Sequence, residues 1–403
     1  MRISTSMLNQ DAVNGILADE TQVAQTQAEL STGKSINSPS DNPVGEVQLL
    51  QLNNTNAQNT QYISNGQAAN TNLTLEEQAL STSTTTLQSI RDLVVEANSG
   101  QNTPADLQAI ATQISSLESS LQGTANSQNA QGQYLFAGYS SSTQPFVRAS
   151  SGAIAYLGDA GTSSVAINSG TSVQTGDPGS SVFMNIPGGN GTFSTAASTS
   201  NTGTGVVDAG SVQDAADWVP GQYTITFSSP TAYTVTNAAG TQVASGIYDS
   251  TQGGEVAFNG VEVGITGAPA AGDTFTVSPS TKQSVFETLD NLISSLNNAG
   301  GSSAARAQLS SSLGTSLQQI DQSLDQITNV SANVGARINL ISSTANAVNT
   351  NSTTVSTQIS NISDLDYASA SAQYSQELVA LQAAEQSYAA IDGLSLFKVL
   401  AGG

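Results

Sequence analysis

The chain has 403 residues, of which 30 are acidic, 8 are basic and none is cysteine or histidine, giving a net charge of −22. This composition excludes disulfides, zinc–thiolate sites and catalysis by a histidine base, and so few scattered cations cannot form the basic patch that nucleic acid or an anionic membrane surface requires. No apolar run approaches the roughly 20 residues of a membrane-spanning helix, and residues 1–7 lack the apolar core of a secretory signal peptide, so we expect either an internal protein or export by another route.

Two helices are predicted at the N-terminal end, over about residues 5–31 and 43–99. Gly33 suits the left-handed position that ends a helix, and a turn rich in Asn, Ser and Pro follows it. Pro43 fits the first turn of the second helix. The apolar residues that recur at intervals of seven are Ile16, Val23 and Leu30 in the first helix, and Leu73, Leu80, Leu87 and Val94 in the second.

A third helix is predicted over about residues 104–130, because Thr103 can cap it and Pro104 fits its first turn. Segment 132–139 is predicted to form a short aromatic strand, and from there to about residue 280 the apolar periodicity is that of strands. We expect the stretch from about 187 to 205, rich in Gly, Ser and Thr, to be a loop. The clearest alternating segments are 222–227, 233–236, 261–265 and 274–277.

Helical periodicity returns near residue 282 and is broken at Gly300 and Gly301. The next helix carries eight apolar residues seven apart, and a looser column four residues after each completes the seam of a coiled coil. Near residue 362 the column breaks and a new column, out of register with the first, begins at Tyr367; the chain ends in an apolar tip. The first column is Leu313, Ile320, Ile327, Val334, Ile341, Val348, Val355 and Ile362; the shifted column and the tip contain Tyr367, Tyr374, Leu381, Tyr388, Ile391, Leu394 and Leu396.

These patterns predict a mixed, mainly α fold, in which a long antiparallel coiled-coil-like bundle from both termini carries an inserted all-β domain. The columns between Leu73 and Ile362 are expected to form the rod core, packed against the second and third helices. The columns of the two ends are expected to form an assembly interface that orders only when copies stack; an ordinary helix pair within a monomer is the alternative. The expected domains are residues 1–38 with 363–403 (terminal assembly), 39–138 with 282–362 (helical rod) and 139–281 (outer β domain).

Paired acidic residues occur at Glu76 with Glu77 and at Asp364 with Asp366. Such pairs can transfer protons or bind a hard cation, but on helices without a cleft we interpret them as solvated surface. Segments 187–191 and 203–208 lack the lysine or the third glycine of nucleotide-binding loops. The sequence therefore predicts no enzyme, no cofactor and no metal site.

Segment 30–43, Leu-Ser-Thr-Gly-Lys-Ser-Ile-Asn-Ser-Pro-Ser-Asp-Asn-Pro, resembles the N-terminal signature of the bacterial flagellin superfamily. The tail, from Ile362-Ser-Asp-Leu-Asp-Tyr to Leu394-Ser-Leu-Phe, resembles the C-terminal signature. Within the superfamily, residues 1–5, 132–139 and 218–279 are similar to the hook-associated protein 3 family of hook–filament junction proteins. The chain has Asp-Asn after Ser40 where common members have two acidic residues.

This resemblance implies a structural, non-enzymatic subunit of the extracellular bacterial flagellum, exported unfolded through the flagellar type III apparatus. It implies self-assembly into a ring between hook-associated protein 1 and flagellin, and an export chaperone bound at the C-terminal helix, with no nucleic-acid or membrane partner. The alternatives are a flagellin filament subunit, a secreted coiled-coil fibre or adhesin with a β head, and a secreted enzyme in the β insert.

Overall fold

The computed structural model describes residues 5–393, and the chain divides into two compact units. Unit 1 is Met1–Ser64 with Thr344–Gly403, and unit 2 is Asn65–Ser343. Helices occupy both ends of the chain and strands the middle, which confirms the predicted fold class. The helices are α1 (Thr5–Thr32), α2 (Pro43–Ala97), α3 (Pro104–Ala125), α4 (Val285–Asn297), α5 (Ser303–Ser363) and α6 (Tyr367–Gly393), with a π-helical turn η1 (Ser180–Met184).

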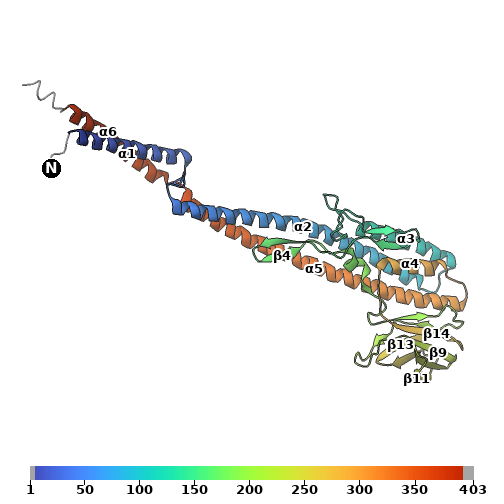
Figure 1. Ribbon diagram of the computed structural model, residues 1–403. Helices are drawn as coiled ribbons and strands as arrows, with labels where there is room; N and C mark the ends of the chain where they lie inside the picture. The colour runs from blue at the N-terminus through green and yellow to red at the C-terminus, as the bar shows by residue number, and fades with distance from the viewer. Residues whose placement is uncertain (1–4, 394–403) are drawn as a thin grey trace, which may run out of the picture. The chain divides into compact units, whose positions relative to one another are not determined.

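Unit 1 consists of helices. In it, α1 and α6 lie side by side (Figure 1). The first turns of α2 and the last turns of α5 also belong to it, and the Ser352 hydroxyl on α5 donates to the Asn56 side-chain oxygen on α2 at 2.7 Å. Leu49, Val348 and Val355 are buried in this part of the chain. Within residues 5–393, no helix combines the length and the apolar character needed to cross a membrane.

The helical core of unit 2 combines α2, α3, α4 and α5. Helices α3 and α4 pack against each other (Figure 1), and α3 begins with a capping box in which Thr103 and Asp106 bond reciprocally. An aromatic cluster lies in the same core: Phe146 contacts Phe183 and Phe286 at ring-centroid distances of 5.5 and 5.3 Å. The strands that precede residue 187 therefore pack on the helices.

Unit 2 has a second hydrophobic core, which lies among the later strands and shares no residue with the first. One sheet has the order β11-β10-β9-β14-β6, and the other has β12-β13-β7 with β8 also paired to β13. The hairpin between β12 and β13 turns at Asn259 and Gly260, whose φ angles are 45° and 74°, as expected for a two-residue Asn-Gly turn.

The strand bounds, in chain order, are β1 (Phe146–Arg148), β2 (Ile154–Tyr156), β3 (Ser164–Asn168), β4 (Thr171–Gln174), β5 (Ile186–Pro187), β6 (Phe193–Ala197), β7 (Val206–Val207), β8 (Ser211–Val212), β9 (Tyr223–Ser229), β10 (Ala232–Asn237), β11 (Gln242–Ile247), β12 (Gly254–Phe258), β13 (Val261–Thr266), β14 (Thr274–Pro279) and β15 (Lys282–Gln283).

Two expectations for single segments are wrong. Segment 132–139 is a series of turns instead of a strand, because Gly132 and Gly138 adopt φ angles of 76° and 68° and each turns the chain. The expected loop at 187–205 contains β6, which pairs with β14 and buries Phe193 completely. A single large apolar residue anchors that strand, so its alternation was too weak to detect.

Candidate assembly surface

The terminal helices α1 and α6 leave most of their apolar side chains only partly covered. Of their described side chains, only Thr26 (3% exposed) and Ala370 (5% exposed) are buried. A helix packed on a core normally buries its apolar face, so this pair retains apolar surface for other helices. Ile16, Val23, Leu30, Tyr374, Leu381 and Tyr388 are partly buried and Tyr367 is exposed; Ile391 lies in the last turn of α6, and Leu394 and Leu396 lie outside the described residues.

The residues expected to form the rod core lie on α2 and α5 in both units. Most are buried in the helical core of unit 2, whereas Val348 and Val355 are buried in unit 1 and Ile362 is half-buried there. The apolar column on α5 thus contributes buried residues to both units. The members in the core of unit 2 are Leu73, Leu80, Leu87, Val94, Leu313, Ile320, Ile327, Val334 and Ile341.

A backbone latch joins the α1–α2 connection to the α5–α6 connection. The Ser35 amide donates to the Ser363 carbonyl at 2.8 Å, and the Leu365 amide donates to the Gly33 carbonyl at 3.0 Å. Gly33 has a φ of 70°, and a Cβ placed on it would lie 2.6 Å from the Tyr367 hydroxyl oxygen. The latch fixes the end of α1 and the start of α6, and the positive φ of residue 33 favours glycine there.

The turn before α2 is held by short polar side chains. The Asp41 carboxylate accepts from the Ser38 and Asn37 amides at 2.8 and 3.1 Å, and Asn42 caps α2 by accepting from the Gly45 amide at 2.9 Å. Ile36 is buried under this turn. The segment that carries the N-terminal family signature is thus an ordered turn that positions the start of α2.

The first two turns of α2 expose an apolar patch, which we call the α2 stripe: Val44, Val47 and Leu50. They are 69%, 64% and 57% exposed. A groove of about 430 Å³ follows on the same part of α2, with Leu52 and Ile362 among its lining residues. Contiguous exposed apolar side chains mark contact sites on proteins. This patch was not among the surfaces predicted from the sequence, although apolar residues spaced by three directly after a helix cap indicate one apolar side.

The two acidic pairs lie in different surroundings. Asp364 and Asp366 are exposed, and Asp366 caps α6 by accepting from the Ala368 amide at 3.0 Å. Glu76 is only 1% exposed, so its interpretation as solvated surface is wrong. It lies on the buried face of α2, between Leu73 and Leu80 in the sequence. Across residues 5–393, no three acidic side chains gather closely enough to hold a metal ion.

Three family models match the chain. They are the bacterial flagellin N-terminal helical region over residues 3–141, the bacterial flagellin C-terminal helical region over 317–400, and the D2-like domain of flagellar hook-associated protein 1 over 196–279. Flagellar hook-associated protein 3 of Salmonella typhimurium is 32% identical over 186 residues, which is 46% of this chain and 58% of that relative. The chain thus spans less than two thirds of the length of this relative.

Solved structures match over more of their length. Hook-associated protein 3 from Legionella pneumophila is 31% identical with a TM-score of 0.73, covering 79% of this chain and 98% of that one. FlgL from Xanthomonas campestris is 31% identical with a TM-score of 0.71, covering 76% of this chain and 98% of that one. The chain belongs to the flagellar hook-associated protein 3 family. The resemblance seen in the sequence is confirmed, and the flagellin helical regions match this hook-associated protein 3 homologue over α1 to α3 and over most of α5 with α6.

Proposed function

We propose that this chain is a structural subunit of the bacterial flagellum that connects the hook to the flagellin filament. The observation that carries the proposal is the uncovered apolar surface of α1 and α6 in a member of the hook-associated protein 3 family. Such a role requires binding surfaces and no catalytic group. The neighbours in this proposal are hook-associated protein 1 on one side and flagellin on the other.

Assembly is proposed to occur through the terminal helices of unit 1. Fully burying one large apolar side chain stabilises a contact by about 1.5–3 kcal/mol, so completing the cover over several of the partly exposed residues favours association. The tyrosines of α6 suit this role because their rings bury apolar area while their hydroxyls reach water. The α2 stripe adds a second surface, and unlike surfaces that meet in successive copies generate a ring where the rotation closes and a helical tube where it does not.

Export through the flagellar type III apparatus is part of the same proposal. The chain has no cysteine, so no disulfide can hold it folded during passage. An export chaperone is proposed to cover α6, whose Tyr374, Leu381 and Tyr388 are only partly buried. A disulfide engineered into unit 2 is expected to stall secretion under oxidising conditions and not under reducing ones, as measured by the amount of chain outside the cell. Equal secretion in both conditions contradicts passage as an unfolded chain.

Removing residues 364–403 tests the assembly role. Cells that lack the native gene and carry this truncation are expected to secrete flagellin without forming hook-attached filaments, and therefore not to swim. The matched control is full-length chain with Ile247→Ser, because Ile247 is 90% exposed and lies in β11, far in sequence from α6. Circular dichroism checks that the truncated chain retains folded unit 2. Swimming cells with the truncation contradict the proposal.

A further inference from the structure

Unit 2 buries two glutamates, each on the apolar face of a helix. Glu76 on α2 and Glu118 on α3 are both 1% exposed. One carboxyl oxygen of each is buried without a hydrogen-bond partner: Oε2 of Glu76 and Oε1 of Glu118. A buried carboxylate without full hydrogen bonding is costly, and such a group normally shifts its pKa and becomes neutral. The charges around each glutamate decide whether that happens here.

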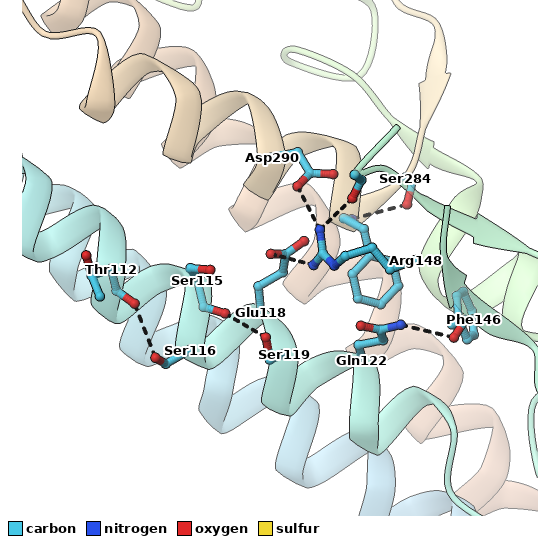
Figure 2. A network of polar contacts seen from close by, with 12 residues as sticks. Thr112, Ser115, Ser116, Glu118, Ser119, Gln122, Phe146, Arg148, Ser284 and Asp290 are labelled. Carbon is cyan, nitrogen blue, oxygen red and sulfur yellow. Dashed lines mark hydrogen bonds and ion pairs between the residues drawn. The ribbon is translucent and has the colours of Figure 1, made fainter. Parts of the chain in front are cut away.

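Glu118 shares a single arginine with a second acid. Figure 2 shows Arg148, from β1, between Glu118 of α3 and Asp290 of α4. Arg148 Nη2 lies 2.9 Å from Glu118 Oε2, and Arg148 Nη1 lies 3.5 Å from Asp290 Oδ1. Nη1 also donates to the Gly152 carbonyl at 2.6 Å. The charged groups facing Glu118 are thus one cation and one anion, so the site carries a net negative charge if both acids ionise.

Glu76 also lies near an aspartate and an arginine, but here the arginine pairs with the aspartate. Asp177, in the segment after β4, forms a bidentate pair with Arg337 of α5 at 2.8 and 3.1 Å. Glu76 receives only the Asp177 amide, which donates to its Oε1 at 3.1 Å. The charged groups facing Glu76 are Asp177 and Arg337, and the guanidinium contacts the aspartate instead of the glutamate. Its neighbour on α2, Glu77, accepts from the Ser331 hydroxyl at 2.6 Å.

Both glutamates therefore favour the protonated form in the folded chain. Burial, then the charge of Asp177, raises the pKa of Glu76 to about 8 from an ordinary value of 4.5, against the opposing Asp177 amide and Arg337. Burial and the charge of Asp290 raise the pKa of Glu118, while Arg148 opposes them. The unfolded chain releases these protons at a lower pH. Folding thus takes up protons between the unfolded and folded pKa values, and stability falls as pH rises through that interval.

We propose that unit 2 contains a pH-sensitive folding device: two buried glutamates, each near one aspartate and one arginine, take up protons on folding, so the unit folds more readily in acid than in alkali. For each proton taken up, the folding equilibrium constant falls tenfold with every unit by which the pH rises. The role of this device rests on the proposed export of an unfolded chain. In that setting, the device favours folding after exit wherever the exterior is more acidic than the cell.

The test measures urea unfolding of the full-length chain by circular dichroism from about pH 5 to about pH 8. The folding equilibrium constant of the native sequence is expected to fall about tenfold per pH unit over much of this range. The double variant Glu76→Gln/Glu118→Gln is expected to lose most of that dependence, because glutamine does not titrate. Glu96→Gln is the matched control, since Glu96 lies on α2 and is exposed, and it is expected to keep the native dependence. A double variant that keeps the native dependence overturns the proposal.

A second measurement needs no variant. Infrared spectra of the folded native chain at about pH 6 are expected to show the C=O band of protonated carboxyl groups, which the unfolded chain lacks at that pH because its glutamates ionise well below it. Absence of the band in the folded chain overturns the proposal even if the double variant does not fold. Motility of cells carrying the native chain is a separate readout: cells that swim although the band is absent refute the folding device alone and leave the junction role intact.

Discussion

Replacing Gly33 by alanine tests the latch between the two terminal connections. Gly33 has a φ of 70°, and the left-handed conformation costs a residue with a Cβ about 1–2 kcal/mol. The added Cβ would also lie 2.6 Å from the Tyr367 hydroxyl oxygen, the far end of a side chain that is 56% exposed and can shift, so this contact adds at most about 1 kcal/mol, the low end of an overpacking cost. We expect Gly33→Ala to destabilise the latch by about 1–3 kcal/mol from these two sources together.

Amide hydrogen exchange at Ser35 and Leu365 is the assay, because these amides form the latch. A loss of about 1–3 kcal/mol lowers their protection by roughly fivefold or more, since about 1.4 kcal/mol is a factor of ten. The double variant Gly33→Ala/Tyr367→Phe removes the hydroxyl oxygen. It is expected to recover the part of the lost free energy that comes from overpacking, and not the part that comes from the φ angle of residue 33.

Gly15→Ala is the control, since nothing lies within 4 Å of a Cβ at this position on α1. It is expected to stabilise the helix by about 0.5–1 kcal/mol. Unchanged protection at Ser35 and Leu365 in Gly33→Ala refutes the latch.

Three other substitutions have defined outcomes. Val47→Asp is expected to change the unfolding free energy of the monomer by less than about 0.5 kcal/mol but to impair motility. The control is Val219→Asp, at a position 58% exposed in unit 2, which is expected to leave both unchanged. Motile Val47→Asp cells contradict a role for the α2 stripe. Ile320→Ala, in the fully buried core of unit 2, is expected to cost about 2–5 kcal/mol in urea unfolding, and a smaller loss places Ile320 outside a tightly packed core. Thr103→Ala removes the α3 cap and is expected to cost about 1 kcal/mol, seen as a lower Tm; an unchanged Tm refutes the cap.

The helices could be predicted because their apolar residues repeat over many turns. The columns at Leu73 to Val94 and at Leu313 to Val334 are buried in one core, as spacings of seven and four indicate. The strands with strict alternation, such as β9 and β14, were equally clear. These signals depend only on residues close together in the sequence, so they can be recognised without knowing what each element contacts.

The remaining features depend on contacts between distant segments. Strand β6 exists because β14 pairs with it, and its own residues other than Phe193 are small. The buried state of Glu76 could have been inferred, because position 76 follows Leu73 by three and precedes Leu80 by four, which places it on the seam. Its partners Asp177 and Arg337 could not, since they are 101 and 261 positions away in the chain and only the folded core brings them together.

Immunogold labelling of isolated flagella tests the central claim most directly. Antibody raised against the full-length chain and absorbed against flagellin is expected to label a single narrow zone where hook meets filament. Purified flagella from cells that lack the gene provide the control and are expected to carry no label. Label along the whole filament would instead identify a filament subunit, and absence of label from intact flagella would contradict a structural role in the flagellum.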